Sequence, residues 1–219
     1  MLSMNLKIQL LWAFIISVVS LIGFSLMAIM ISRHQIVAFD SAIISYVQGL
    51  ETPALTTIMK FFTFVGSGNA IFVIAVIVMF LLYVVLHHRS ELVLFAIVIA
   101  FASILNRMLK DFFHRARPDF HRLVEIGGYS FPSGHAMSAM AVYGALAFLL
   151  WRHIPTRIGR SILIILSAMM IFMIGISRVY LGVHYPSDII GGYFASGFWL
   201  AIAIWFYQRY KERRYNRKS

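Results

Sequence analysis

The sequence predicts an all-α, polytopic membrane protein with six transmembrane helices and a short interfacial helix between the first two spans. Hydrophobic residues make up 61% of the chain and charged residues only 12%, and the mean hydropathy is +0.84. Apolar stretches long enough to cross a bilayer recur along the chain. The length of 219 residues fits one membrane-embedded domain, residues 1–219. The chain has no cysteine, which excludes disulfides and thiolate chemistry.

Six apolar stretches define the predicted spans. The first is too long for the core of a signal peptide and lacks a convincing small-residue cleavage site, so we interpret it as a retained span. Polar or turn-forming segments separate the later ones. The predicted spans are residues 8–31, 70–86, 92–109, 136–151, 161–176 and 189–207.

The segment between the first two spans has the pattern of an interfacial helix. Asp40 can act as its N-cap, and Thr52-Pro53 ends it. Apolar residues between these points share one face, as in a helix that lies on the bilayer. These residues are Ile43, Ile44, Val47 and Leu50.

The positive charge is concentrated at the C-terminus. The net charge is +11, and six of the 19 Lys and Arg residues lie in the last eleven positions. A basic tail at about residues 209–219, directly after a span, is typical of a cytoplasmic anchor against anionic lipid. Nucleic-acid binding is disfavoured because no folded soluble region is available to carry it. Cytoplasmic termini place eleven cations inside and eight outside, so the positive-inside rule predicts this orientation.

Three polar clusters fall at the same predicted end of the bundle. The first runs from Lys110 to Arg117, at the outer end of the third span, and Pro118 follows. Their separation is close to two helical turns, so the two cations are predicted to project from one face. Pro118 favours an extended Arg117 and ends the helix. Taken alone, the pair is better explained as interfacial cations that reach toward lipid headgroups.

The second cluster is the stretch FPSGH, which opens the fourth span. Ser133 is a good N-cap, and Gly134 allows a ligand to approach the backbone closely. The free N–H groups and the positive dipole end of a helix bind anions. His135 would then lie in the first turn, beside a bound anion. The alternative is plain helix capping with a chance histidine.

The third cluster joins the last two spans and runs from Ser177 and Arg178 to His184 and Asp188. If helical geometry begins early enough, His184 and Asp188 are i, i+4 neighbours and can hydrogen-bond. A carboxylate on one imidazole nitrogen fixes the tautomer and makes the other nitrogen a better nucleophile. The alternative is a loop with an incidental His/Asp pair.

Together the clusters favour phosphate over a metal ion. Two histidines and an aspartate would suit zinc in number. However, the fixed cations Lys110, Arg117 and Arg178 would repel a divalent cation and would attract a doubly charged phosphate.

The three motifs resemble a known family. K-x6-R-P, P-S-G-H and S-R-x5-H-x3-D span residues 110–188. They resemble the signature of the type 2 phosphatidic acid phosphatase superfamily, with the greatest likeness to bacterial phosphatidylglycerophosphatase B-type membrane lipid phosphatases. The six-span layout extends this resemblance over nearly the whole chain.

The resemblance implies a role for each matching residue. His184 would attack phosphorus and form a phosphohistidine, oriented by Asp188, and His135 would protonate the leaving alkoxide and then activate water. The phosphate-binding residues would be Lys110, Arg117, Ser133, Gly134 and Arg178. No metal and no other cofactor is implied.

The implied function is dephosphorylation of a membrane lipid phosphate, with phosphatidylglycerophosphate as the first candidate and phosphatidylglycerol as its product. Undecaprenyl diphosphate and phosphatidic acid are close alternatives, and a lipid phosphotransferase would differ only in the acceptor. A non-enzymatic anion or lipid transporter is less favoured because the polar clusters gather at one end of the bundle. The expected partners are the lipid substrate and the bilayer, with a monomer as the simplest assembly.

The remaining histidines are interpreted as solvated or interfacial, because they lie in or beside predicted loops. They are His34, His87, His88, His114, His121 and His153. Further polar residues of the loop at 111–130 are candidates for headgroup contact, although their spacing carries no specific signal. These are His114, Arg115, Asp119, Arg122 and Glu125.

Overall fold

The computed structural model describes residues 4–119 and 121–216, and the regular elements in these ranges are helices. Six of them are long and apolar enough to cross a membrane, which confirms the predicted fold class and the number of spans. In chain order the elements are α1 (Met4–Ser32), α2 (Val37–Gly49), α3 (Pro53–Val65), α4 (Gly68–Phe80) with a π-helical turn η1 (Leu81–Val85), α5 (Arg89–Phe113), α6 (Gly134–Trp151), α7 (Arg157–Tyr180) and α8 (Pro186–Asn216).

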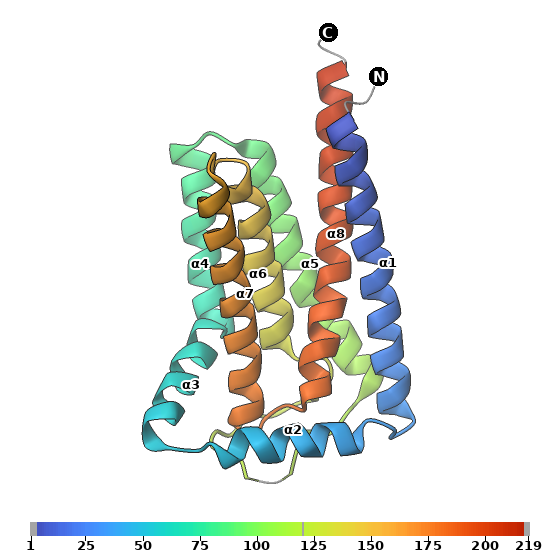
Figure 1. The fold of residues 1–219 in the computed structure, drawn as a ribbon, viewed down its shortest axis with the longest axis vertical. Helices are drawn as coiled ribbons and strands as arrows, with labels where there is room; N and C mark the ends of the chain where they lie inside the picture. Colours follow the sequence, from blue (N-terminus) through green and yellow to red (C-terminus); the bar gives the residue numbers. More distant parts are fainter. Residues whose placement is uncertain (1–3, 120, 217–219) are drawn as a thin grey trace.

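The long helices form two groups, which meet where α8 packs against α5 and α6 (Figure 1). Helix α1 packs along α8, and α4 to α7 form the rest of the bundle. Helix α6 is enclosed by α5, α7 and α8. It is rich in alanine, and Ala136, Ala139, Ala141 and Ala145 are at most 1% exposed. Small residues allow helix backbones to approach closely in a membrane, so the composition of α6 accounts for its central place.

Two short helices, rather than one, connect the first two spans. Helix α2 lies across one end of the bundle, and α3 rises from it toward α4 (Figure 1). The prediction that Asp40 caps the interfacial helix is wrong, because α2 begins at Val37 and its N-cap is Ile36. Asp40 lies in the first turn and is 2% exposed. The predicted break at Thr52-Pro53 is present, and it marks the start of α3, with Thr52 as N-cap and Pro53 as the first helical residue.

The predicted apolar face of this interfacial helix is only partly buried. Ile44 and Val47 are buried and Ile43 is half-buried, as the pattern indicates. Leu50 follows the last residue of α2 and is 50% exposed. Leu50 therefore does not share the buried face, because the helix already ends at Gly49.

Helix α8 continues beyond the length that a bilayer requires. Its 31 residues at about 1.5 Å each give roughly 46 Å, against a hydrocarbon core of about 30 Å. In Figure 1 its last turns extend past the other helices. The predicted basic tail is therefore a continuation of α8 as far as Asn216, and its last residues, 217–219, lie outside the described residues.

The topology brings the three polar clusters to one end of the bundle. Successive spans run in opposite directions, so the α5–α6 and α7–α8 connections lie at the same end. Helices α2 and α3 lie at this end too, whereas the start of α1 and the end of α8 lie at the other (Figure 1). Polar residues that are up to 148 positions apart in sequence, such as Asp40 and Asp188, can therefore share one site.

Candidate active site

A histidine–aspartate pair forms the centre of the polar end. The Nδ1 atom of His184 lies 3.2 Å from Oδ2 of Asp188. His184 is 2% exposed and Asp188 is fully buried. The predicted i, i+4 contact is present although α8 begins only at Pro186, after His184. Asp188 lies in the first turn of α8, and its carboxylate also accepts a hydrogen bond from the backbone N–H of Tyr185 at 2.9 Å.

The turn that leads from α7 to His184 depends on a glycine. Gly182 has a φ of +73°, a conformation that other residues rarely adopt. A Cβ atom there would clash with the backbone carbonyl of His121. The loop around His121 is tied to this turn by the backbone N–H of Leu123, which donates to the carbonyl of Leu181 at 3.1 Å.

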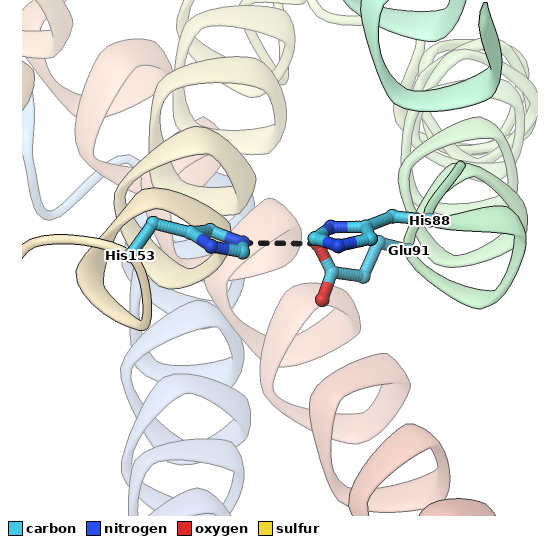
Figure 2. Close-up of side chains that lie close together, drawn as sticks. All are labelled: His88, Glu91 and His153. Atoms are coloured by element: carbon cyan, nitrogen blue, oxygen red, sulfur yellow. Dashed lines mark hydrogen bonds and ion pairs between the residues drawn. The ribbon is translucent and has the colours of Figure 1, made fainter. Parts of the chain in front are cut away.

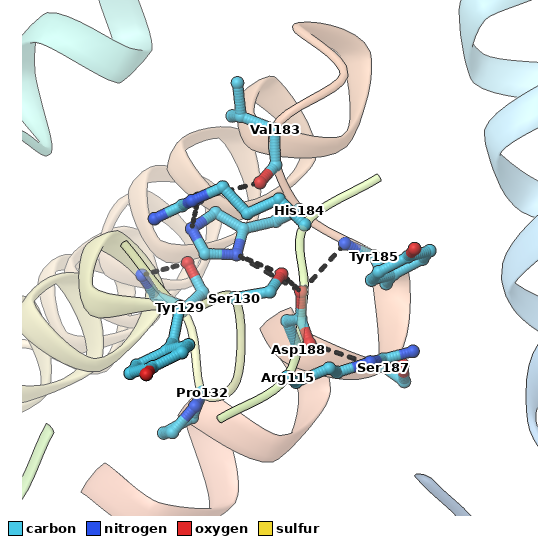
Figure 3. Close-up of polar contacts among 12 residues, drawn as sticks. Arg115, Tyr129, Ser130, Pro132, Val183, His184, Tyr185, Ser187 and Asp188 are labelled. Carbon is cyan, nitrogen blue, oxygen red and sulfur yellow. Dashed lines mark hydrogen bonds and ion pairs between the residues drawn. The ribbon is translucent and has the colours of Figure 1, made fainter. Parts of the chain in front are cut away.

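Asp188 has a full set of partners besides the histidine (Figure 3). The Nη1 atom of Arg115 lies 2.6 Å from its Oδ1, and the hydroxyl of Ser130 donates to its Oδ2. A buried carboxylate is costly unless it is paired and hydrogen-bonded. These contacts let Asp188 remain ionised in a position that water does not reach.

Arg115 also connects Asp188 to helix α2. Its Nη2 atom lies 2.8 Å from Oδ2 of Asp40. Asp40 additionally accepts the backbone N–H and the hydroxyl of Ser187, at 2.9 and 2.6 Å. Arg115 was a candidate for headgroup contact from the sequence, but its guanidinium points inward and stacks over the Tyr185 ring at 4.0 Å. The sequence analysis missed this Asp40–Arg115–Asp188 bridge, and the available signal was that Asp40 is the one charged residue of α2.

The second nitrogen of His184 faces a cation. Nε2 lies 3.1 Å from Nη1 of Arg117. Arg117 can only donate hydrogen bonds, and the Asp188 carboxylate accepts one from Nδ1. These neighbours therefore place the proton on Nδ1 and leave a lone pair on Nε2. Burial is the main cause that lowers the pKa of His184 from 6.5 to about 4, against the opposing effect of Asp188. Arg117 and Arg178 lower this pKa further. His184 is therefore neutral at neutral pH and has an unprotonated Nε2.

Lys110 and Arg117 converge on one loop by a different route from the one predicted. Helix α5 ends at Phe113, and His114 adopts a left-handed conformation with φ of 46°. Arg117 therefore lies beyond the helix, and the prediction that it shares a helix face with Lys110 is wrong. Lys110 donates to the backbone carbonyl oxygens of Tyr129 and Ser130. Arg117 donates to those of Gly127 and Gly128, and to Val183 at 2.8 Å.

The start of α6 has the predicted cap. Ser133 has extended backbone angles, and its hydroxyl accepts the N–H of Ala136. Its own N–H donates to the Asp188 carbonyl at 3.1 Å, which joins the two helix starts. Gly134 packs against Asn106, whose Oδ1 would lie 3.1 Å from an added Cβ.

His135 lies at a cavity of about 310 Å³ that also reaches Lys110 and Gly134. The cavity is formed by the α3–α4 turn and the facing ends of α5 and α6. Its full lining is Gly66, Gly68, Ser103, Asn106, Arg107, Lys110, Gly134, His135 and Ser138. A second, larger groove of about 1430 Å³ lies between α1, α6 and α8, and its lining includes none of the eight predicted site residues.

Arg178 is a buried cation with unused donors. It is 3% exposed, and its Nη1 donates to the hydroxyl of Thr63 on α3 at 2.6 Å. Its Nε and Nη2 are buried and have no hydrogen-bond partner among the described residues. An unpaired buried guanidinium is strongly unfavourable. The free donors therefore match a bound anion, and phosphate oxygens suit the guanidinium fork.

The described site thus joins a neutral imidazole with an ionised partner, three cations that can be directed at an anion, and a capped helix N-terminus. This combination, at one end of a bundle of membrane helices, is typical of a membrane-embedded phosphatase.

Comparisons with known proteins agree with this class. Residues 91–212 match the model of the PAP2 superfamily. The chain is 32% identical over 172 residues to phosphatidylglycerophosphatase B of Bacillus subtilis, covering 78% of this chain and 84% of that protein. It is 34% identical over 118 residues to a lipid A 1-phosphatase of Rhizobium johnstonii, covering 49% of this chain and 41% of that protein.

A solved structure has the same fold. The crystal structure described as the first transmembrane PAP2 type phosphatidylglycerolphosphate phosphatase, from Bacillus subtilis, superposes with a TM-score of 0.78 at 30% identity. The match covers 87% of this chain and 94% of that one. The chain therefore belongs to the PAP2 superfamily and is a membrane lipid phosphatase of that family.

Proposed function

We propose that this protein hydrolyses phosphatidylglycerophosphate to phosphatidylglycerol through a phosphohistidine on His184, without a metal ion. The observation that carries this proposal is the asymmetric environment of His184. Its Nδ1 is held by Asp188 and its Nε2 faces Arg117. The choice of substrate is supported by the names of the Bacillus subtilis relative and of the matching solved structure.

In the first step Nε2 of His184 attacks the phosphorus atom, and the bond from phosphorus to the lipid oxygen breaks. Nη1 of Arg117 now lies 3.1 Å from Nε2, so it must turn away from the lone pair as the phosphoryl group arrives. A phosphoryl oxygen then replaces Nε2 as its acceptor. His135 gives a proton to the departing alkoxide, which leaves as the free lipid alcohol.

In the second step water attacks the phosphohistidine. His135 has lost its proton in the first step, so it can accept one from this water. The bond between phosphorus and Nε2 breaks, inorganic phosphate leaves, and His184 returns to its neutral form. Asp188 stabilises the positive imidazole ring in both steps without giving up its own charge, as in other carboxylate–histidine pairs.

The cations take the role that a metal ion has in other phosphatases. Lys110, Arg117 and Arg178, together with the backbone N–H groups at the start of α6, would hold the phosphoryl oxygens as charge redistributes. The donor set does not suit a metal ion, because Asp188 is saturated by Arg115, Ser130 and His184. The remaining histidine nitrogen, Nε2, faces a guanidinium.

We infer that the site faces the extracytoplasmic side. It lies at the end of the bundle opposite the start of α1 and the end of α8 (Figure 1), and the cation count favours cytoplasmic termini. Because the chain has no cysteine, single cysteines report topology cleanly. An impermeant thiol reagent should label Asp119→Cys in intact cells, since this side chain is fully exposed, and should not label Pro155→Cys. The opposite pattern would reverse the orientation.

The substrate is tested by phosphate release from purified protein in detergent with EDTA present. We expect the highest kcat/KM for phosphatidylglycerophosphate in a panel with phosphatidic acid and undecaprenyl diphosphate. A clear preference for another lipid would overturn the substrate assignment and leave the mechanism standing. Loss of all activity in EDTA, restored by magnesium, would overturn the mechanism. Transfer of phosphate to an added alcohol without release to water would identify a phosphotransferase.

A further inference from the structure

The α4–α5 and α6–α7 connections lie at the opposite end of the bundle from the α7–α8 connection that carries His184 (Figure 1). A second group of histidine and acidic side chains gathers there (Figure 2). His88 is the N-cap residue of α5, and Glu91 lies in the first turn of that helix. His153 comes from the loop between α6 and α7. One carboxylate oxygen, Oε2 of Glu91, lies 3.2 Å from Nδ1 of His88 and 3.5 Å from Nε2 of His153.

Glu91 is a buried carboxylate to which no arginine or lysine of residues 4–119 and 121–216 is paired. It is 5% exposed, and among the described residues its only ion-pair partners are the two imidazoles. Two nearby arginines, Arg152 of the α6–α7 loop and Arg160 of α7, are engaged elsewhere. Arg152 donates to the Tyr207 hydroxyl at 3.4 Å, and Arg160 donates to the carbonyl of Ile154 at 2.8 Å. A buried carboxylate without a charge partner is unfavourable.

Helix capping explains only part of this arrangement. An acid in the first turn interacts favourably with the helix dipole, which accounts for Glu91 on α5. It does not account for His153, which reaches the same oxygen from another loop. The two imidazole rings also stack with centroids 5.0 Å apart, and two protonated rings at this separation would repel each other. A divalent cation would balance the carboxylate while both rings remain neutral.

The distances fit a metal ion. Zinc binds histidine nitrogen and carboxylate oxygen at about 2.0–2.2 Å in tetrahedral geometry, which separates neighbouring ligand atoms by roughly 3.3–3.5 Å. The two separations at Glu91 are 3.2 and 3.5 Å, and the three ligand atoms lie within 4.8 Å of one another. The side chains of His88 and His153 are 36% and 41% exposed, so water can reach a fourth position.

We propose that His88, Glu91 and His153 bind a divalent transition metal ion of the zinc class, with water as the fourth ligand. Two imidazoles and one carboxylate suit zinc better than the hard cations magnesium and calcium, which prefer oxygen ligands. The ion ties the start of α5 to the loop after α6. These two helices carry Lys110 and His135 at their other ends, so the ion stabilises the bundle without touching the phosphate site.

The test is zinc binding by the full chain in detergent, purified with a tag that contains no histidine. After treatment with EDTA and removal of the chelator, the protein is incubated with zinc chloride, desalted and analysed for bound metal. We expect about one retained ion per chain. We also expect a higher temperature of unfolding with zinc than with magnesium. Failure of the wild-type protein to retain zinc would overturn the proposal.

Variants show whether the ion sits at this cluster. His153→Gln and His88→Gln should each lose the retained zinc and the zinc-dependent rise in unfolding temperature. The matched control is His87→Asn, because His87 is adjacent and exposed and is not part of the cluster. His87 has a φ of 55°, which asparagine tolerates. Gel filtration and phosphate release report whether each variant is folded.

Two outcomes would contradict the site. Zinc retained equally by wild-type protein and both glutamine variants would place the ion elsewhere. The glutamine variants could instead unfold at a lower temperature than wild-type protein by the same amount with and without zinc. That result would show that the cluster stabilises the fold by hydrogen bonds alone.

Discussion

The two ends of the bundle each bring histidine and a buried acid together, yet their surroundings give them different chemistry. At one end Asp188 has a permanent cation, Arg115, at 2.6 Å, and the free nitrogen of His184 faces Arg117. At the other end Glu91 has two imidazoles and no arginine within ion-pair distance among the described residues. Fixed cations repel a metal ion and attract phosphate, whereas their absence leaves the imidazole lone pairs free for a metal. The residues around a histidine therefore decide its role more than the histidine itself.

The largest expected effect separates the two ends directly. His184→Gln should lower kcat/KM by at least roughly four orders of magnitude for every substrate, because the atom that accepts the phosphoryl group is gone. His153→Gln, at the far end, should change kcat/KM by less than about threefold, since it touches no reacting atom. Phosphate release from a lipid and from an aryl phosphate measures both. Substantial turnover in His184→Gln would mean that His184 does not accept the phosphoryl group, and the two ends of the bundle would not differ in the way described.

The next effect separates the two histidines of the active site. His135→Ala should lower lipid turnover by roughly 10²- to 10⁴-fold, because the basic alkoxide leaves without a proton. An aryl phosphate has an acidic leaving group, so the variant should still phosphorylate itself. Without a base for the attacking water the phosphoenzyme should accumulate. The measurement is a burst of phenol followed by slow turnover, with trapped label that is stable in alkali and lost in acid. A trapped intermediate in His184→Gln would reverse the assignment.

A smaller loss is expected from Arg178→Lys. The substitution keeps the charge but removes the forked donors, of which Nε and Nη2 are unpaired in the described residues. We expect kcat/KM to fall roughly 10²-fold, and orthovanadate, which resembles pentacoordinate phosphorus, to inhibit the variant more weakly. Arg122→Lys is the control, because Arg122 lies in the α5–α6 loop, outside the proposed phosphate-binding set, and pairs with the exposed Asp119 at 3.7 Å. Equal losses in both variants would indicate a general charge effect.

Asp40→Asn tests the bridge through Arg115. Loss of this charge loosens Arg115, which lies 2.8 Å from Asp40 and 2.6 Å from Asp188. Because Asp40 positions the pair and does not touch substrate, we expect about a tenfold loss in kcat with little change in KM, by analogy with outer-shell partners of other sites. Rescue by Asp40→Glu, but not by Asp40→Gln, would support a role through charge. Asp119→Asn is the exposed control, and a change of KM alone would contradict the positioning role.

The smallest effect is a pH dependence of stability. The pKa of His184 is about 4 in the folded protein, against an ordinary value of 6.5. As pH falls from 6.5 to 4 the unfolded state takes up a proton that the folded state does not, so the free energy of unfolding decreases across this window. Above pH 6.5 the imidazole is neutral in both states and contributes no dependence. Melting curves in detergent should show that acid lowers the unfolding temperature of wild-type protein more than that of His184→Gln. Parallel curves would mean that the imidazole is not buried in its neutral form.

The spans could be predicted from the sequence because they depend on local composition. An apolar stretch of sufficient length must satisfy its backbone groups within a helix in the bilayer, whatever its neighbours are. The clustering of the motifs at one end then follows from the alternating direction of the spans. The cap at Ser133 was likewise local, since a capping side chain bonds to its own helix.

The partners of the polar side chains depended on the tertiary structure. Arg115 meets Asp40 across 75 positions, and Arg178 meets Thr63 across 115, so neither pair has a spacing that could be recognised. Helix α5 also ends at Phe113, before Arg117, which no helical periodicity indicates. The sequence alone determined which residues are apolar enough to span the membrane and which polar motifs lie at their ends. Only the packing of the helices decided which charges meet, because a buried charge is stabilised by whichever partner the fold brings within a few ångströms.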